Sequence, residues 1–171
     1  DKAIDIANET INNFSIDYKK RWLGMMRKKL GIFGEENDDE NLITSLLSWM
    51  QQNKADYTNT FCSLIEEEIP KDKLFQDKIF LNWHQQWQTR LKQNKKPKKL
   101  SLNMMRITNP LIIPRNHKVE ESLDAANIGD LVPMYNLLEA LKKPYDSRSE
   151  ITAYRSPPAP SEHIYQTFCG T

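Results

Sequence analysis

Glycine, histidine and cysteine are scarce in this chain of 171 residues, and each scarcity excludes a class of site. The 5 glycines show neither the spacing of a phosphate-binding loop nor that of a dinucleotide-binding fingerprint. The 3 histidines have no cysteine or carboxylate at metal-ligand spacing, and no serine lies in a nucleophile elbow. From the residues alone, we therefore expect no catalytic, cofactor-binding or metal-binding residue in this chain.

The 2 cysteines, Cys62 and Cys169, are too few and too far apart for the disulfide framework of a small secreted domain. No apolar run approaches the roughly 20 residues of a membrane-spanning helix. The net charge of +1 gives no overall attraction to nucleic acid or to an anionic membrane. We expect a cytoplasmic protein without membrane or nucleic-acid partners. Because the chain begins with Asp1 and no signal-peptide pattern follows, we also expect a processed protein or a piece of a longer one.

Apolar residues recur at helical spacing through most of the chain. Residues 2–30 form the longest such pattern, and Gly31 is its expected end. Shorter amphipathic patterns cover residues 42–50, the stretch from Asp56 to Pro70, residues 72–93, and a few residues before Asn109. No segment shows the strict alternation of a half-buried strand. The fold class that we predict is all-α, an irregular multi-helix bundle.

Two further helices are predicted between Pro114 and Pro144. Val119 opens the apolar spacing of the first, and Gly129 ends that helix. Asp130 then caps the second helix, which Pro144 terminates. The two helices should therefore be joined by a corner of one to two residues.

The last residues have a different composition. Pro157, Pro158 and Pro160 disfavour a regular helix, so we divide the chain into a helical domain, residues 1–144, and an extended Pro-rich tail, residues 145–171. Ile164 and Phe168 are too apolar for a tail that contacts nothing, and the tail should dock on another surface. Cys169 is the one residue of chemical interest, as an accessible redox thiol or as an inert terminal cysteine.

Three other features have a functional and a structural interpretation. The acidic run of residues 34–40 lacks the ligand order of a calcium loop and is interpreted as a solvated linker. The lysine-rich run of residues 92–99 has no interleaved aromatic, which favours an interhelical loop over a nucleic-acid site. Trp83 and Trp87 lie one helical turn apart, where they would form part of the core or grip a ligand.

The C-terminal third resembles a known family. The stretch Asn109-Pro110-Leu111-Ile112-Ile113-Pro114-Arg115-Asn116-His117, the residues Gly129-Asp130-Leu131 and Pro144-Tyr145, and the terminal Tyr165-Gln166-Thr167-Phe168-Cys169-Gly170-Thr171 are similar to the C-terminal region of the selenoprotein O family. Weaker similarity extends to Ala55-Asp56-Tyr57-Thr58 and to Trp83, Trp87 and Arg90. The resemblance therefore covers most of the chain.

The resemblance implies a parent protein with a kinase-like fold that transfers AMP from ATP to protein hydroxyl groups, with Mg²⁺ or Mn²⁺. The family's nucleotide-binding motifs precede the region matched here, so the resemblance carries over no catalytic residue. The implied partners are a missing N-terminal kinase-like domain and the parent's protein substrates. Cys169 matches the position where family members have selenocysteine or cysteine, which implies redox regulation.

The prediction is thus a non-catalytic helical segment that supports the catalytic domain. The alternative is a free-standing helical module whose apolar stripes bind a partner helix. If the chain is a piece of a longer protein, the surface meant for the rest of that protein would favour self-association.

Overall fold

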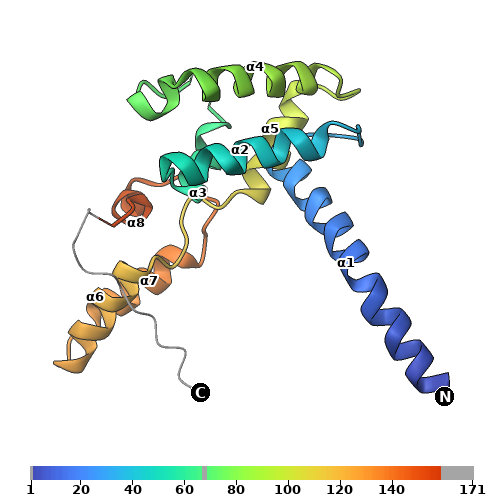
Figure 1. Cartoon of the computed structure of the whole chain (residues 1–171). Helices are drawn as coiled ribbons and strands as arrows, with labels where there is room; N and C mark the ends of the chain where they lie inside the picture. Colours follow the sequence, from blue (N-terminus) through green and yellow to red (C-terminus); the bar gives the residue numbers. More distant parts are fainter. Residues whose placement is uncertain (1, 67–68, 159–171) are drawn as a thin grey trace. The chain divides into compact units, whose positions relative to one another are not determined.

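The structure is a computed structural model that describes residues 2–66 and 69–158, in which helices joined by loops are the regular elements (Figure 1). The elements in chain order are α1 (Lys2–Lys29), α2 (Asp39–Asn53), α3 (Tyr57–Ser63), η1 (Lys73–Gln76), α4 (Lys78–Lys92), α5 (Lys98–Thr108), α6 (Asn116–Asn127), α7 (Val132–Leu141), η2 (Ser149–Ile151) and α8 (Thr152–Arg155). No β-strand occurs in these two ranges, and the predicted all-α class is confirmed. None of the described helices is long and apolar enough to cross a membrane.

The chain divides into two compact units, and the first comprises residues 1–55 and 63–108. Its core lies where α2 packs on α4, with aromatic rings from both helices and from η1. Trp49 contacts Phe75 and Phe80 at ring-centroid distances of 5.8 and 4.6 Å, and Trp83 stacks on Trp87 at 5.9 Å. Both of these last tryptophans are almost fully buried, which confirms the core interpretation of the pair.

Each core tryptophan also has a partner for its indole N–H. Trp83 donates to the carbonyl of Leu42 at 2.8 Å, and Trp87 donates to the carbonyl of Leu30 at 2.9 Å. These bonds satisfy a buried donor that would otherwise cost about 1–3 kcal/mol. The aromatic cluster therefore fixes the orientation of α4 as well as filling the core.

The single helix expected over residues 72–93 is interrupted at Asp77. This residue adopts an extended conformation with ψ 135°, after η1 and before α4. Its carboxylate accepts a hydrogen bond from the indole N–H of Trp49 at 2.8 Å, across 28 positions of sequence. The prediction of a continuous helix is wrong here because a long-range contact outweighs local helical spacing.

Gly31 ends α1 as predicted, because it adopts a φ of +70° that is favourable only for glycine. A Cβ atom at this position would lie 2.8 Å from Sδ of Met105 on α5. Gly31 therefore serves two purposes: it reverses the chain after α1, and it lets α5 approach closely.

The second unit comprises residues 56–62 and the chain from residue 109 on. Its main feature is the hairpin of α6 and α7, which begins two residues after Pro114 rather than at it. Gly129, with φ +88°, forms the corner, and the Asp130 carboxylate accepts the N–H of Val132 at 3.0 Å. The predicted helix pair is confirmed, but residues 128–131 separate α6 from α7, so the predicted corner of one to two residues is too short.

A small core in this unit contains Ile112, Ala140 and Ile151. Ile151 belongs to the segment that we predicted to be extended, where η2 and α8 form instead. The prolines at 157 and 158 come after α8 and exclude a helix only there, so the apolar Ile151 can pack as part of a helical turn. The proposed division at residue 145 stays a prediction, and residues 159–171 lie outside the described part.

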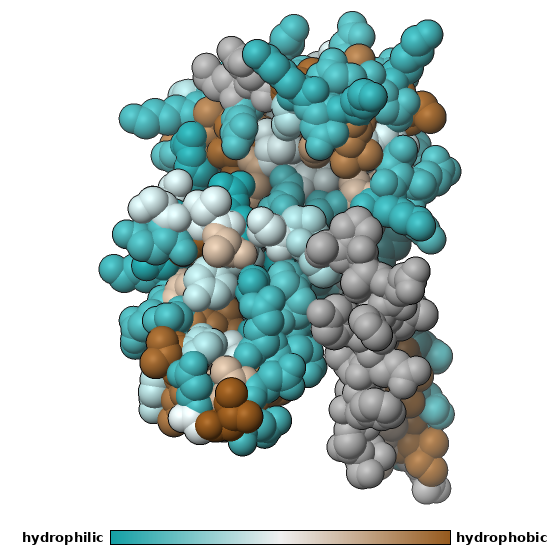
Figure 2. Space-filling model, turned by 90° about the vertical axis from the view of Figure 1, so that its left-hand side faces the viewer, coloured by the Kyte–Doolittle hydropathy of each residue, from teal (hydrophilic) through white to brown (hydrophobic). Residues whose placement is uncertain are grey.

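The α6–α7 hairpin also exposes apolar side chains. Figure 2 shows hydrophobic side chains at the lower end of the face it presents, where this hairpin lies. The exposed apolar residues of α7 and the preceding corner are Ile128, Leu131, Val132, Tyr135 and Leu138.

Candidate functional site

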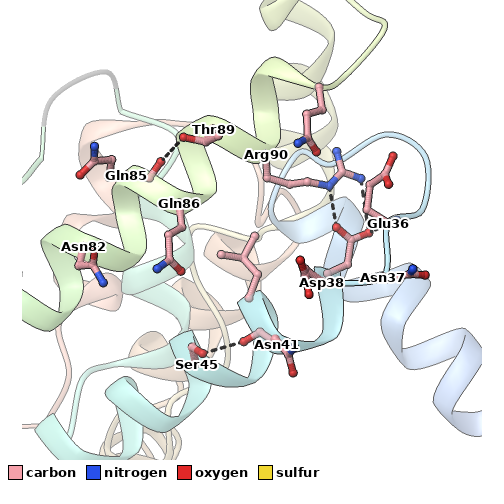
Figure 3. Close-up of a pocket in the computed structure, with 13 residues that line it drawn as sticks. Glu36, Asn37, Asp38, Asn41, Ser45, Asn82, Gln85, Gln86, Thr89 and Arg90 are labelled. Atoms are coloured by element: carbon pink, nitrogen blue, oxygen red, sulfur yellow. Dashed lines mark hydrogen bonds and ion pairs between the residues drawn. The ribbon is translucent and has the colours of Figure 1, made fainter.

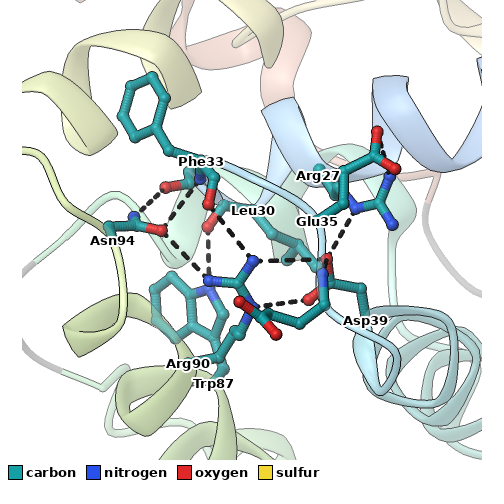
Figure 4. A network of polar contacts seen from close by, with 10 residues as sticks. Arg27, Leu30, Phe33, Glu35, Asp39, Trp87, Arg90 and Asn94 are labelled. Carbon is teal, nitrogen blue, oxygen red and sulfur yellow. Dashed lines mark hydrogen bonds and ion pairs between the residues drawn. The ribbon is translucent and has the colours of Figure 1, made fainter.

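The most concentrated polar chemistry of the first unit surrounds Asp39, the first residue of α2. Its carboxylate is fully buried and accepts hydrogen bonds from Nε of Arg27 at 2.7 Å and from Nε of Arg90 at 2.6 Å (Figure 4). The backbone N–H of Glu36 donates a third bond at 3.0 Å. One carboxylate therefore joins the end of α1, the start of α2 and the last turn of α4.

The pKa of Asp39 lies below its ordinary value because of these donors. Burial alone raises the pKa of the carboxyl, but the hydrogen bond from Arg90, the N–H of Glu36 and the hydrogen bond from Arg27 together outweigh burial. The group is therefore a carboxylate at neutral pH. Both of its oxygens are already used by protein donors, which leaves it unsuited to act as a general base.

Asn94 extends this network to the loop after α1. Its side-chain oxygen accepts from the N–H of Phe33 at 3.0 Å, and its amide nitrogen donates to the carbonyl of Gly31 and to Oγ of Ser101, both at 2.9 Å. Arg90 also donates to the carbonyl of Phe33 at 3.3 Å. The polar network thus holds the chain reversal that Gly31 makes.

A cleft of about 770 Å³ runs between α2 and α4 beside this network (Figure 3). Asp39 and Arg90 form one end of its wall, and uncharged hydrogen-bonding groups line most of the rest. Six of the 13 lining residues carry a side-chain amide: Asn37, Asn41, Asn82, Gln85, Gln86 and Gln93. Such a surface can donate and accept hydrogen bonds, and the lining residues include no cysteine, lysine or histidine.

In the second unit, Arg115 and Asp56 form a two-point ion pair. Nη1 and Nη2 of Arg115 donate to the two carboxylate oxygens of Asp56 at 2.7 and 3.0 Å. Asp56 also accepts the N–H of Asn59 at 2.7 Å, so it caps α3 as predicted. Burial raises the pKa of Asp56, while the bonds from Arg115 and from the N–H of Asn59 lower it by more. The pair connects the start of α3 with the residue before α6.

The structure describes some of the residues that we singled out from the sequence. Cys169 lies outside the described residues, so its environment stays a prediction. Cys62 is buried in α3, where its thiol donates to the carbonyl of Pro110 at 3.3 Å. His84 packs against Phe80 and Trp87, and burial lowers the pKa of its imidazole.

The Asp39 network was missed in the sequence. Asp39 belongs to the acidic run of residues 34–40, which we interpreted as a solvated linker, yet this one carboxylate is buried. Arg27 and Arg90 look like ordinary charged residues of their helices. Nothing near either one in the sequence indicates an ion pair with Asp39. Covariation of positions 27, 39 and 90 among related sequences would have been the only signal of this network. Among residues 2–66 and 69–158, no group of three or more His, Cys, Asp or Glu side chains is arranged to hold a metal ion.

Comparison with known proteins gives the family of the chain. The model of the family described as protein adenylyltransferase SelO matches residues 3–142. The protein nucleotidyltransferases YdiU of Nitrosococcus oceani and Alcanivorax borkumensis are 46% and 48% identical to this chain over 172 aligned residues. YdiU of Clostridium perfringens is 47% identical over 171 residues.

In each of these three comparisons the alignment covers 100% of this chain but only 35% or 36% of the relative. The chain thus spans about a third of the length of the relatives it matches. The family match includes α1 through α7, so it extends over both units. The chain therefore belongs to the SelO family of protein adenylyltransferases.

Proposed function

We propose that this chain is the helical C-terminal part of a protein adenylyltransferase, and that it supports catalysis without performing it. The whole protein would transfer AMP from ATP to hydroxyl groups of protein substrates. The observation that carries the proposal is the family match over residues 3–142, together with the 35% of the relatives' length that the chain spans. The remaining two-thirds of such a protein is large enough for a separate catalytic domain.

The described residues do not fit ATP with its metal ion. The buried carboxylate of Asp39, in the wall of the cleft, accepts hydrogen bonds from two guanidinium groups and a backbone N–H, so the protein's own cations already neutralise it. Six of the 13 residues that line the cleft carry uncharged amides and three are acids, and no lysine or glycine is among them to receive phosphates. These contacts support assigning ATP and Mg²⁺ or Mn²⁺ to the rest of the protein.

The test compares the full-length protein with this chain. We expect the full-length protein to bind ATP and to label a protein substrate with AMP in the presence of Mg²⁺ or Mn²⁺, and the chain alone to do neither. Binding of ATP by the isolated chain in the micromolar range would contradict the proposal. Removing the residues after Tyr154 from the full-length protein then measures what the C-terminal segment adds to the activity.

Redox regulation through Cys169 is the second part of the proposal, and it rests on the family resemblance of the terminal motif. We expect AMP transfer by the full-length protein to change on mild oxidation and to recover with a thiol reductant. The Cys169→Ser variant should lose this response, whereas Cys62→Ser should keep it because Cys62 is buried. An unchanged response in Cys169→Ser would contradict this part.

A free-standing interaction module is the second candidate, and the exposed apolar residues of the α6–α7 hairpin favour it. In that case the surface would bind another protein's helix. The reading frame that encodes the chain discriminates between the two functions. A kinase-like domain encoded in the same frame supports the first and contradicts the second.

A further inference from the structure

Residues 3–25 of α1 carry an apolar stripe, most of whose large side chains are exposed to solvent. At about 100° per residue, Ala3, Ile4, Ala7, Ile11, Phe14, Tyr18, Trp22 and Met25 fall within a sector roughly 100° wide. The exposed fractions of Ile11, Phe14 and Tyr18 are 71%, 68% and 60%. The rings of Phe14 and Tyr18 stack on each other at 6.1 Å. An apolar face of large side chains interspersed with alanine thus runs along about six helical turns.

A different face of α1 joins the helix to its own unit. Met26 is fully buried and Leu30 follows it into the core, whereas Met25, the neighbour of Met26, remains 41% exposed. By the helical geometry, Met26 and Leu30 lie roughly 90–130° around the helix from the centre of the stripe. Helical spacing alone predicts one apolar stripe that includes Met25, Met26 and Leu30, and that prediction is wrong. The exposed stripe is a second face, not an extension of the core of the unit.

A helix with such a face needs a surface to pack against. Most helical stability in proteins comes from tertiary packing of the apolar face rather than from the helix alone. The opposite side of α1 carries both Lys2 and Lys20 as well as Glu9 and Asp17. This mixture of charges does not match the basic polar face typical of a helix that lies on a membrane.

The comparisons indicate which surface is missing. The family match begins at residue 3, so α1 is part of the family's shared structure. The alignment with the relatives leaves about two-thirds of their length outside this chain. We propose that the stripe Ile4–Ile11–Phe14–Tyr18 packs against the portion of the same polypeptide that lies outside this chain, and so attaches the helical part to the rest of the protein. This inference rests only on that part of the proposed function which places the chain in a longer protein.

Hydrogen exchange of the α1 backbone amides tests the proposal, in the full-length protein and in this chain at low micromolar concentration. We expect residues 5–20 to exchange about 100-fold more slowly in the full-length protein than in the chain alone. The Ile11→Asp variant should remove most of that protection. Ile16→Asp is the matched control, because Ile16 is 66% exposed but lies off the stripe, and it should leave the protection in place.

A second pair of variants applies if Ile11→Asp prevents folding. In Ile11→Cys and Ile16→Cys, the rate of maleimide labelling in the folded full-length protein should be about 100-fold lower at position 11, measured by peptide mass spectrometry. Equal labelling at positions 11 and 16, or equal exchange in the two proteins, would overturn the proposal.

Protection of α1 in the dilute isolated chain would also overturn it, because the chain's other unit would then cover the stripe. Protection that rises with the concentration of the full-length protein would assign the stripe to a second copy and would also overturn it. Absence of AMP transfer from a full-length protein whose α1 is protected would contradict the proposed function alone.

Discussion

Arg90 and Asp39 form a buried ion pair, with 2.6 Å between Nε and Oδ1, although 51 positions separate them in the sequence. The pair fixes the last turn of α4 to the first residue of α2, and Arg27 adds the end of α1 to the same carboxylate. Three helices therefore depend on one charge. Removing the Asp39 carboxylate would leave Arg90 buried without a counter-charge.

The Asp39→Asn variant should lose about 3–5 kcal/mol of unfolding free energy, because the buried Arg90 guanidinium then lacks a neutralising carboxylate and Arg27 keeps only the exposed Glu35, 3.2 Å away. Urea unfolding followed by circular dichroism measures the change. Asp38→Asn is the control, since Asp38 is the preceding residue and is exposed, and it should change the free energy by less than about 0.5 kcal/mol. Equal changes in unfolding free energy for the two substitutions would show that the Asp39 network does not stabilise the fold more than an exposed carboxylate does.

The stability of the chain should fall in acid through Asp39 and Asp56. Both carboxyl groups have a pKa below the ordinary 3.8 in the folded state, so the folded chain holds these protons more weakly than the unfolded chain. Their contribution is complete above the unfolded pKa and is lost as the pH falls through the lower folded values. The urea midpoint should therefore change little between about pH 7 and 5 on their account and drop below about pH 4.

The Asp39→Asn variant also tests the origin of that pH dependence. Its urea midpoint should fall less steeply than that of the unaltered chain below about pH 4, because one of the two depressed carboxyl groups is gone. A midpoint that rises on acidification, or an identical acid profile in the variant, would refute the assignment.

The local signals of the sequence predicted the helices well, because those signals act over a few residues. Gly31 and Gly129 end their helices in conformations that only glycine adopts readily, and Asp56 caps α3 through a bond to a residue three positions away. Helical spacing also placed Trp83 and Trp87 together in the core. Features that depend on neighbouring residues could be predicted for this reason.

The features that the sequence did not predict depend on contacts between distant residues. The break at Asp77 follows from a bond to Trp49, and the burial of Asp39 follows from two arginines on other helices. Spacing alone also cannot show that α1 has two apolar faces, because Met25 and Met26 look equivalent until one is seen to be buried and the other exposed. Long-range partners are not encoded in any local window.

Self-association of the isolated chain should occur through its exposed apolar faces. We expect the mass measured by sedimentation to exceed the 20.1 kDa of the monomer as the concentration rises. Leu138→Lys on α7 should reduce the association, because Leu138 is 50% exposed on the apolar side of the hairpin. Glu139→Lys is the control, since it places the same charge one position away on a polar, exposed side chain. A chain that stays monomeric at high concentration would contradict the prediction.

Two glycines of the first unit should respond oppositely to alanine. Gly31→Ala introduces a Cβ at φ +70°, 2.8 Å from Sδ of Met105, and should lower the unfolding free energy by about 1–3 kcal/mol. Gly24 lies inside α1 with no atom within 4 Å of a Cβ built there, so Gly24→Ala should raise the stability by about 0.5–1 kcal/mol through the better helix propensity of alanine. Urea unfolding of both variants under the same conditions measures the difference. If Gly31→Ala were neutral, the close approach of α5 to the end of α1 would have to be looser than the structure shows, since neither the positive φ nor the sulfur contact would then carry an energetic cost.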